Sequence, residues 1–109
     1  MDNCLFCKII KKEIAAEIVL DTQDCLAFKD INPVAPHHYL VIPKTHFASI
    51  TEIDAKISAA LIEAIQELAK NFELKDFRTV LNTGVKAGQT VFHVHAHVIA
   101  GRRLEWPPG

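Results

Sequence analysis

Three histidines alternate with small apolar residues near the end of the chain, in the run His93-Val94-His95-Ala96-His97. Alternate side chains of a strand point to the same face, so the run predicts three imidazoles on one face and apolar side chains on the other. Same-face neighbours lie roughly 7 Å apart, which places the outer two histidines roughly 13 Å apart, too far to share one metal ion without a sharp bend. Because three adjacent imidazoles have no packing rationale, the run indicates chemistry.

Imidazole suits nucleophilic or acid–base chemistry because its unperturbed pKa of about 6.5 leaves a basic nitrogen available at neutral pH. When one ring nitrogen donates to a fixed acceptor, the lone pair of the other is free to attack. The central His95 is therefore the candidate nucleophile, and its neighbours can donate to the charge that develops on the electrophile. A phosphoryl group matches this site, since its oxygens need several donors. Further donors precede the run at Gly84, Gly88, Gln89 and Thr90.

A second reactive group is the cysteine pair Cys4 and Cys7, in a Cys-x-x-Cys spacing. Three cysteines cannot all pair within one chain, and no secretory signal precedes them, so thiols or metal ligands are expected rather than a disulfide. Zinc binding and redox chemistry both use this spacing. The βαβ context of thioredoxin-like proteins is missing around the pair, which favours zinc. The third cysteine, Cys25, is predicted to be a small buried residue.

The elements that must position these groups indicate an α+β fold with a five-stranded antiparallel sheet. Apolar residues at helical spacing predict a short helix at about 5–13 and a long one from about 54 to 72, capped by Thr51 or Asp54. Two prolines exclude the segment 30–36 from the sheet. Runs of β-forming residues between turn signals predict strands at 18–20, 25–28, 38–42, 77–81 and 91–99.

Length and composition limit the class of protein. The chain has 109 residues, of which 50% are hydrophobic, enough for one domain over 1–109 with one packed core. The formal net charge of -1 argues against a nucleic-acid partner. The first residues lack the pattern of a signal peptide, and no apolar run approaches the ~20 residues that span a bilayer. We therefore expect no membrane partner and a cytoplasmic location.

The chain resembles the histidine triad (HIT) superfamily, and its Hint branch in particular. The run 93–99 fits the signature His-φ-His-φ-His-φ-φ, in which φ is apolar. The closing Trp106-Pro107-Pro108-Gly109 matches the Hint branch, whereas the Fhit branch shares only the triad and its Gly-Gln-Thr-Val lead-in. The resemblance extends over almost the whole chain, and its other matching segments are 6–10, 25–31, 33–38, 41–44, 82 and 88–91.

The resemblance implies a purine nucleoside phosphoramidase, which cleaves the P–N bond of nucleoside 5'-phosphoramidates. It implies His95 as the nucleophile that forms a transient nucleotidyl-histidine, with His97 and His38 at the α-phosphate. The carbonyl of His93 would orient the nucleophile, and Asp30 would accept from the ribose hydroxyls. The implied nucleotide-binding residues, several of which would also suit an ordinary core or a turn, are Leu5, Phe6, Ile9, Phe28, Asp30, Ile31, Asn82, Gly88, Gln89, Thr90, Val91 and Trp106.

The resemblance also implies a structural zinc site and a homodimer, but no cofactor for the chemistry itself. Zinc would be held by Cys4, Cys7, His46 and His93. The sheet would continue across two subunits, and the tail 101–109 would reach the partner's active site. Three other functions stay open: a dinucleoside polyphosphate hydrolase of the Fhit type, a module that binds purine nucleotides without turnover, and a zinc-dependent scaffold.

Overall fold

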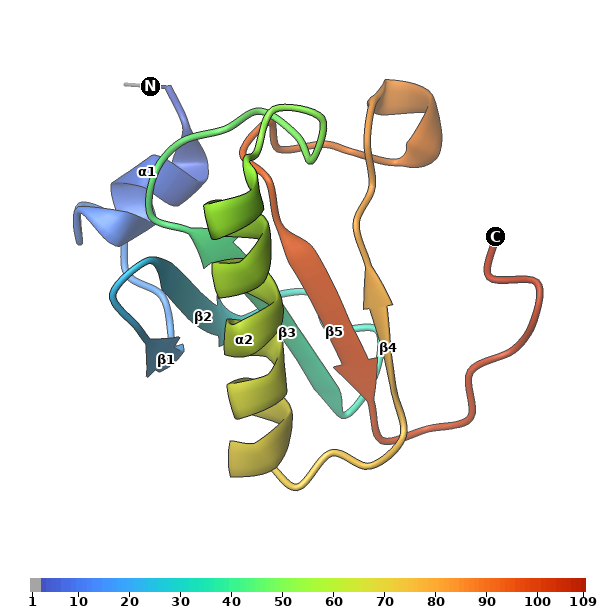
Figure 1. The fold of residues 1–109 in the computed structure, drawn as a ribbon. Helices are drawn as coiled ribbons and strands as arrows, with labels where there is room; N and C mark the ends of the chain where they lie inside the picture. Colours follow the sequence, from blue (N-terminus) through green and yellow to red (C-terminus); the bar gives the residue numbers. More distant parts are fainter. Residues whose placement is uncertain (1–2) are drawn as a thin grey trace.

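The structure, a computed structural model, describes residues 3–109 as a twisted five-stranded sheet with the long helix lying across one face (Figure 1). The helices are α1 (Leu5–Ile10) and α2 (Ala55–Asn71), with a short 3₁₀ turn, η1 (Val85–Ala87). The strands are β1 (Ile18–Asp21), β2 (Cys25–Lys29), β3 (His37–Pro43), β4 (Phe77–Val80) and β5 (Ala96–Ala100). This confirms the α+β fold with two helices and five strands.

The sheet has the order β1-β2-β3-β5-β4, and every neighbouring pair is antiparallel. The last strand in sequence therefore lies between β3 and β4. In the register of β3 with β5, Leu40 faces His97 and His38 faces Ile99. The pairing of β3 with β5 thus brings a histidine from the first half of the chain next to the histidine run.

The strand residues alternate between two apolar clusters, one on each face of the sheet. The face beneath α2 buries Leu61 and Leu68 against the strands, and the other face buries Phe6 and Ile9 of α1. The sheet residues under α2 are Cys25, Ala27, Tyr39, Val41, Ala96 and Val98. The sheet residues under α1 are Leu26, Phe28, Leu40 and Ile42. Because β5 follows this alternation, His97 lies on the α1 face between two residues of the α2 face.

The long helix begins and ends where the sequence predicts. Asp54 is its N-cap, and its carboxylate accepts from the N–H of Ile57 at 2.9 Å. The short helix ends earlier than predicted, at Ile10 rather than 13. The backbone of Lys12 turns left-handed (φ 64°), and the N–H of Glu13 returns to the carbonyl of Lys8 at 2.8 Å, which closes the helix. No helix within residues 3–109 has the length and apolarity needed to cross a bilayer.

The predicted strand 91–99 is wrong at its start, because β5 begins only at Ala96. Its ladder with β3 begins at the pair Val41 and Ala96. Before Ala96, the N–H of Val94 donates to the carbonyl of the loop residue Phe47 at 2.7 Å. The carbonyl of Pro43, at the end of β3, accepts from the ring of His93. The backbone before Ala96 is thus bonded away from the sheet, so the first two triad histidines precede the strand.

Candidate active site and metal centre

A pocket of about 490 Å³ opens on the α1 face of the sheet, between α1, the loop 30–36 and the approach to β5. Three of the predicted catalytic histidines line it, namely His38, His95 and His97. Eight predicted nucleotide-binding residues line it as well: Leu5, Phe6, Ile9, Phe28, Asp30, Ile31, Thr90 and Val91. Segments from both ends of the chain therefore build one concave site.

His95 is held in a single orientation by the backbone of its neighbour. Its Nδ1 donates to the carbonyl oxygen of His93 at 2.8 Å, so the lone pair of the neutral ring is on Nε2. Nε2 makes no hydrogen bond within residues 3–109, and no buried side-chain nitrogen there lacks a partner, so this atom faces the open pocket. Phe6 packs edge-on against the ring with centroids 5.1 Å apart. A ring held in this way can present its Nε2 lone pair to an electrophile in the pocket.

His97 lies beside His95 as a neutral ring. The two ring centroids are 5.0 Å apart, and Nδ1 of His97 is 2.9 Å from Nε2 of His38. Burial, with smaller contributions from His95 and His38, lowers the pKa of His97 to about 4. Burial also lowers the pKa of His38, although Asp30 opposes this shift. The site therefore offers neutral imidazole donors at pH 7 rather than cations.

One wall of the pocket is apolar, and one carboxylate lies beside His38. Phe6 and Phe28 meet edge to face at 5.5 Å, and Ile9 and Leu40 complete the wall. Asp30 accepts from the N–H of Asn32 at 2.8 Å through Oδ1, and its Oδ2 is 3.4 Å from His38. A ligand with a flat apolar part, hydroxyl groups and an anionic group would match these three kinds of side chain.

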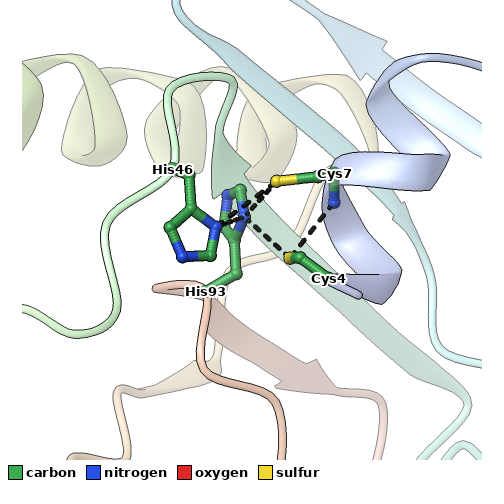
Figure 2. A group of neighbouring side chains, drawn as sticks. All are labelled: Cys4, Cys7, His46 and His93. Atoms are coloured by element: carbon green, nitrogen blue, oxygen red, sulfur yellow. Dashed lines mark hydrogen bonds between the residues drawn. The ribbon is translucent and has the colours of Figure 1, made fainter. Parts of the chain in front are cut away.

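A second cluster joins α1 to the residues before β5, and Figure 2 shows its four side chains converging. The ligand atoms of Cys4, Cys7, His46 and His93 all lie within 4.8 Å of one another. His46 Nδ1 is 3.2 Å from His93 Nδ1, and Cys7 Sγ is 3.3 and 3.5 Å from these two atoms. A tetrahedral zinc ion with these ligands requires N···N of about 3.3 Å and S···N of about 3.6 Å. The cluster therefore fits zinc.

Hydrogen bonds around this cluster prepare its atoms for a cation. Nε2 of the fully buried His93 donates to the carbonyl of Pro43 at 2.8 Å, which leaves the lone pair of Nδ1 directed at the cluster. Burial and the neighbouring Cys4 raise the pKa of the Cys7 thiol. A metal ion would offset this cost, because thiols lose their proton on coordination.

The HIT domain matches residues 11–104 of this chain. The chain belongs to the HIT domain family. It is similar to a HIT family hydrolase of Legionella pneumophila Philadelphia 1, with a TM-score of 0.93 and 41% identity over 98% of this chain and 100% of that one. An uncharacterized HIT-like protein of Synechococcus elongatus is 45% identical over 99% of this chain and 98% of its own length. A 14 kDa zinc-binding protein of Zea mays is 42% identical over 96% of this chain and 87% of its own length.

Four residues expected to bind nucleotide do not line the pocket of this HIT domain. The amide of Gln89 is buried and holds loops together: it accepts from Gly84 N–H at 2.9 Å and donates to the carbonyls of Ala48 and Val91 at 2.7 and 3.2 Å. The other three are Asn82, Gly88 and Trp106, and Trp106 is 81% exposed. The ring of His93 belongs to the metal cluster, so only its carbonyl serves the pocket.

Several residues that line the pocket of the HIT domain were not predicted from the sequence. Leu40 could have been found, because it is two positions from His38 on the same strand and so shares its face. Ile14 and Ala16 lie in the turn after α1 and carry no such signal. Val34 lies in the proline-rich loop, and it contributes its backbone N–H to the site, which no side-chain pattern reveals.

Proposed function

We propose that this HIT protein is a nucleotide hydrolase of the Hint type, which cleaves purine nucleoside 5'-phosphoramidates at the P–N bond. The observation that carries the proposal is the open Nε2 of His95, with Nδ1 fixed by a carbonyl and a neutral donor, His97, beside it. Hydrolase names among similar proteins agree with this reaction type.

The reaction proceeds in two displacements at the α-phosphorus. Nε2 of His95 forms a bond to phosphorus while the P–N bond to the amine breaks, and the leaving nitrogen takes up a proton from solvent. The carbonyl of His93 stabilises the imidazolium that forms, because Nδ1–H already donates to it. Water then attacks phosphorus while the bond from phosphorus to Nε2 breaks, and the water releases a proton to solvent. The products are a nucleoside monophosphate and the neutral imidazole of His95. His97 donates to the phosphoryl oxygens in both steps.

The remaining pocket residues bind the nucleoside. The base lies against the apolar side chains of Phe6, Ile9 and Phe28. Asp30 accepts from the ribose hydroxyls through Oδ2, whose one nearby partner within residues 3–109 is His38 at 3.4 Å. The side chains of Phe6, Ile9 and Phe28 are apolar, so shape and stacking supply most of the binding to the base.

The Cys4, Cys7, His46 and His93 cluster binds one structural zinc ion. Its interatomic distances agree with tetrahedral coordination, and a relative is named for zinc binding. Four protein ligands close the coordination shell, so the ion holds α1 against the residues before β5 and takes no part in the displacement. Its role is to keep the histidine carbonyl in place beside the nucleophile.

The protein acts as a two-fold homodimer with the sheet continued through β4. This strand is an edge of the sheet in the described residues, and Phe77 on it and Ile62 on α2 are exposed. Unpaired edges and exposed apolar side chains favour pairing with a second copy. The tail, with Trp106 largely exposed, would then lie near the partner's pocket.

A fluorogenic adenosine 5'-phosphoramidate tests the reaction, with release of its fluorescent amine and of AMP as the readout. Turnover with stoichiometric AMP supports the proposal. Diadenosine polyphosphates are assayed in parallel, and faster cleavage of these would assign the Fhit-type reaction instead. Tight AMP binding without turnover of either substrate would make the protein a binding module and refute the proposed hydrolysis.

A further inference from the structure

The loop 30–36 reaches the catalytic histidines through its backbone. The N–H of Val34 donates to Nδ1 of His38 at 3.1 Å, and the ring of His38 is buried. A backbone N–H can only donate, so Nδ1 must accept and carry the lone pair. The single proton of the neutral His38 ring is therefore on Nε2.

This proton determines the state of the next ring. Nε2 of His38 lies 2.9 Å from Nδ1 of His97 and 3.4 Å from Oδ2 of Asp30, so its N–H donates chiefly to His97. Nδ1 of His97 must then accept, which leaves the proton of that ring on Nε2. This atom makes no hydrogen bond within residues 3–109 and is not buried, so its N–H faces the pocket beside His95.

We propose that the Val34 N–H and His38 are positioning groups, which hold His97 as a neutral Nε2–H donor aimed at the phosphoryl group. His38 accordingly neither binds the phosphate nor carries a proton during turnover. The inference rests on the proposed function for the identity of the acceptor, although the hydrogen-bond chain itself does not depend on it. The result is a relay of fixed donors from the loop backbone to the reacting oxygen atoms.

Two other roles for these groups conflict with the same contacts. A His38 that accepts a proton would carry N–H at Nδ1, directed against the N–H of Val34. Burial lowers the pKa of His38 and opposes this cation, although Asp30 favours it. A metal ion between Asp30, His38 and His97, whose atoms lie within 4.8 Å, would need a second lone pair on His38 that a neutral imidazole does not have.

Nitrogen NMR of the side-chain rings tests the tautomers directly, using the zinc-loaded full chain. We expect unprotonated Nδ1 and protonated Nε2 for both His38 and His97 at pH 7. Val34→Pro removes the N–H in a loop that already contains two prolines, so His38 should gain the other tautomer. Val34→Ala keeps the N–H and serves as the matched control. Protonated Nδ1 on His97 in the unmodified protein would overturn the proposal.

Paired variants of His38 test the role in catalysis. A glutamine places an amide N–H near the position of Nε2, whereas the shorter asparagine cannot reach His97. Loss of a preorganised donor lowers kcat by roughly 10²-fold, so His38→Asn and His38→Ala should each show a loss of about this size with little change in KM. The kcat of His38→Gln should be at least about tenfold higher than that of His38→Ala, because the proposed role of His38 requires only a fixed donor.

The kinetic and spectroscopic results separate the two proposals. If His38→Gln is as inactive as His38→Ala while both stay folded, His38 carries a proton and the positioning role is wrong. If the unmodified protein does not cleave phosphoramidates, the proposed function fails. The tautomers of His38 and His97 found by NMR still show whether the hydrogen-bond chain exists. If Val34→Pro does not fold, the comparison of glutamine with asparagine at 38 remains decisive.

Discussion

The three histidines of the triad differ in the hydrogen-bond partner of one ring nitrogen, and this difference sets what the other ring nitrogen can do. His93 donates to a carbonyl through Nε2 and so directs Nδ1 to the metal cluster. His95 donates to a carbonyl through Nδ1 and so directs Nε2 to the pocket. His97 accepts at Nδ1 and so offers a donor instead of a lone pair. The partner of one nitrogen thus decides whether the other offers a lone pair to the cysteine cluster, a lone pair to the pocket or an N–H to the pocket.

Replacement of the nucleophile is the first prediction at this scale. His95→Ala should lower kcat for a nucleoside phosphoramidate by about four or more orders of magnitude, because the covalent intermediate cannot form. Affinity for AMP, measured by calorimetry, should change little. His37→Ala is the control, since His37 lies outside the pocket and bonds to Tyr39. Comparable turnover by His95→Ala would refute a covalent mechanism.

The neutral state of His97 predicts how stability depends on pH. Its pKa is about 4 in the folded protein and about 6.5 when unfolded, so between these values only the unfolded chain binds the proton. The free energy of unfolding should therefore fall as pH decreases from about 6.5 to about 4. Asp30, His38 and His95 are the titratable groups that face the ring.

His97→Gln should reduce the slope of the unfolding free energy against pH by the equivalent of up to about one proton. Denaturant unfolding at a series of pH values measures this slope. The comparison is made with metal-free protein, because acid also releases metal from cysteine and histidine ligands. His37→Gln, at a histidine outside the pocket, controls for the loss of an imidazole. Equal slopes for His97→Gln and the unmodified protein would show that His97 titrates normally.

At the scale of elements, α1 is the part that depends most on tertiary contacts. Six residues are too few for a stable isolated helix, so packing of Phe6 and Ile9 and the cysteine cluster must hold it. The same helix supplies one wall of the pocket. The proposed metal site and the proposed nucleotide site therefore share an element, so binding of zinc and binding of nucleotide should strengthen each other.

Removal of zinc should loosen α1 and weaken nucleotide binding while the sheet stays folded. Amide exchange in residues 5–10 should accelerate on chelation, and β3 and β5 should remain protected. Cys7→Ser should reproduce both effects and lower the zinc content well below one per chain, whereas Cys25→Ala, outside the cluster, should keep the metal. Elemental analysis and AMP titration give the readouts. Full zinc content in Cys7→Ser would exclude the proposed site.

At the scale of the whole molecule, the open edge at β4 and the exposed tail predict a dimer. Light scattering at micromolar concentration should give twice the mass of the 12.2 kDa chain. Trp106→Ala should alter the preference among leaving-group amines without changing affinity for AMP, because the tail would reach the leaving-group side of the partner's pocket. Ile50→Ala, another exposed apolar residue, is the control. A monomeric mass would refute the dimer and this role of the tail together.

The sequence by itself determined the elements whose signals are local. The stripe of apolar residues around Leu61 and Leu68, with Asp54 as a cap, specified α2 almost to the residue. Runs of β-forming residues between turn signals specified β2 and β3, and residue types singled out the histidine triad and the cysteine pair. Helical periodicity, capping and turn signals each act over a few residues, so they can be found without knowledge of the fold.

Only the tertiary structure decided how these residues divide the work. Whether His93 and His95 lie on a strand depended on a bond from Val94 to the distant Phe47. The donor state of His97 depends on His38, 59 positions away in the chain, and then on the N–H of a loop residue. A side chain's type states which hydrogen bonds it can make, but non-local packing selects the partner. That selection set the free nitrogen of each histidine, and with it the chemistry of the site.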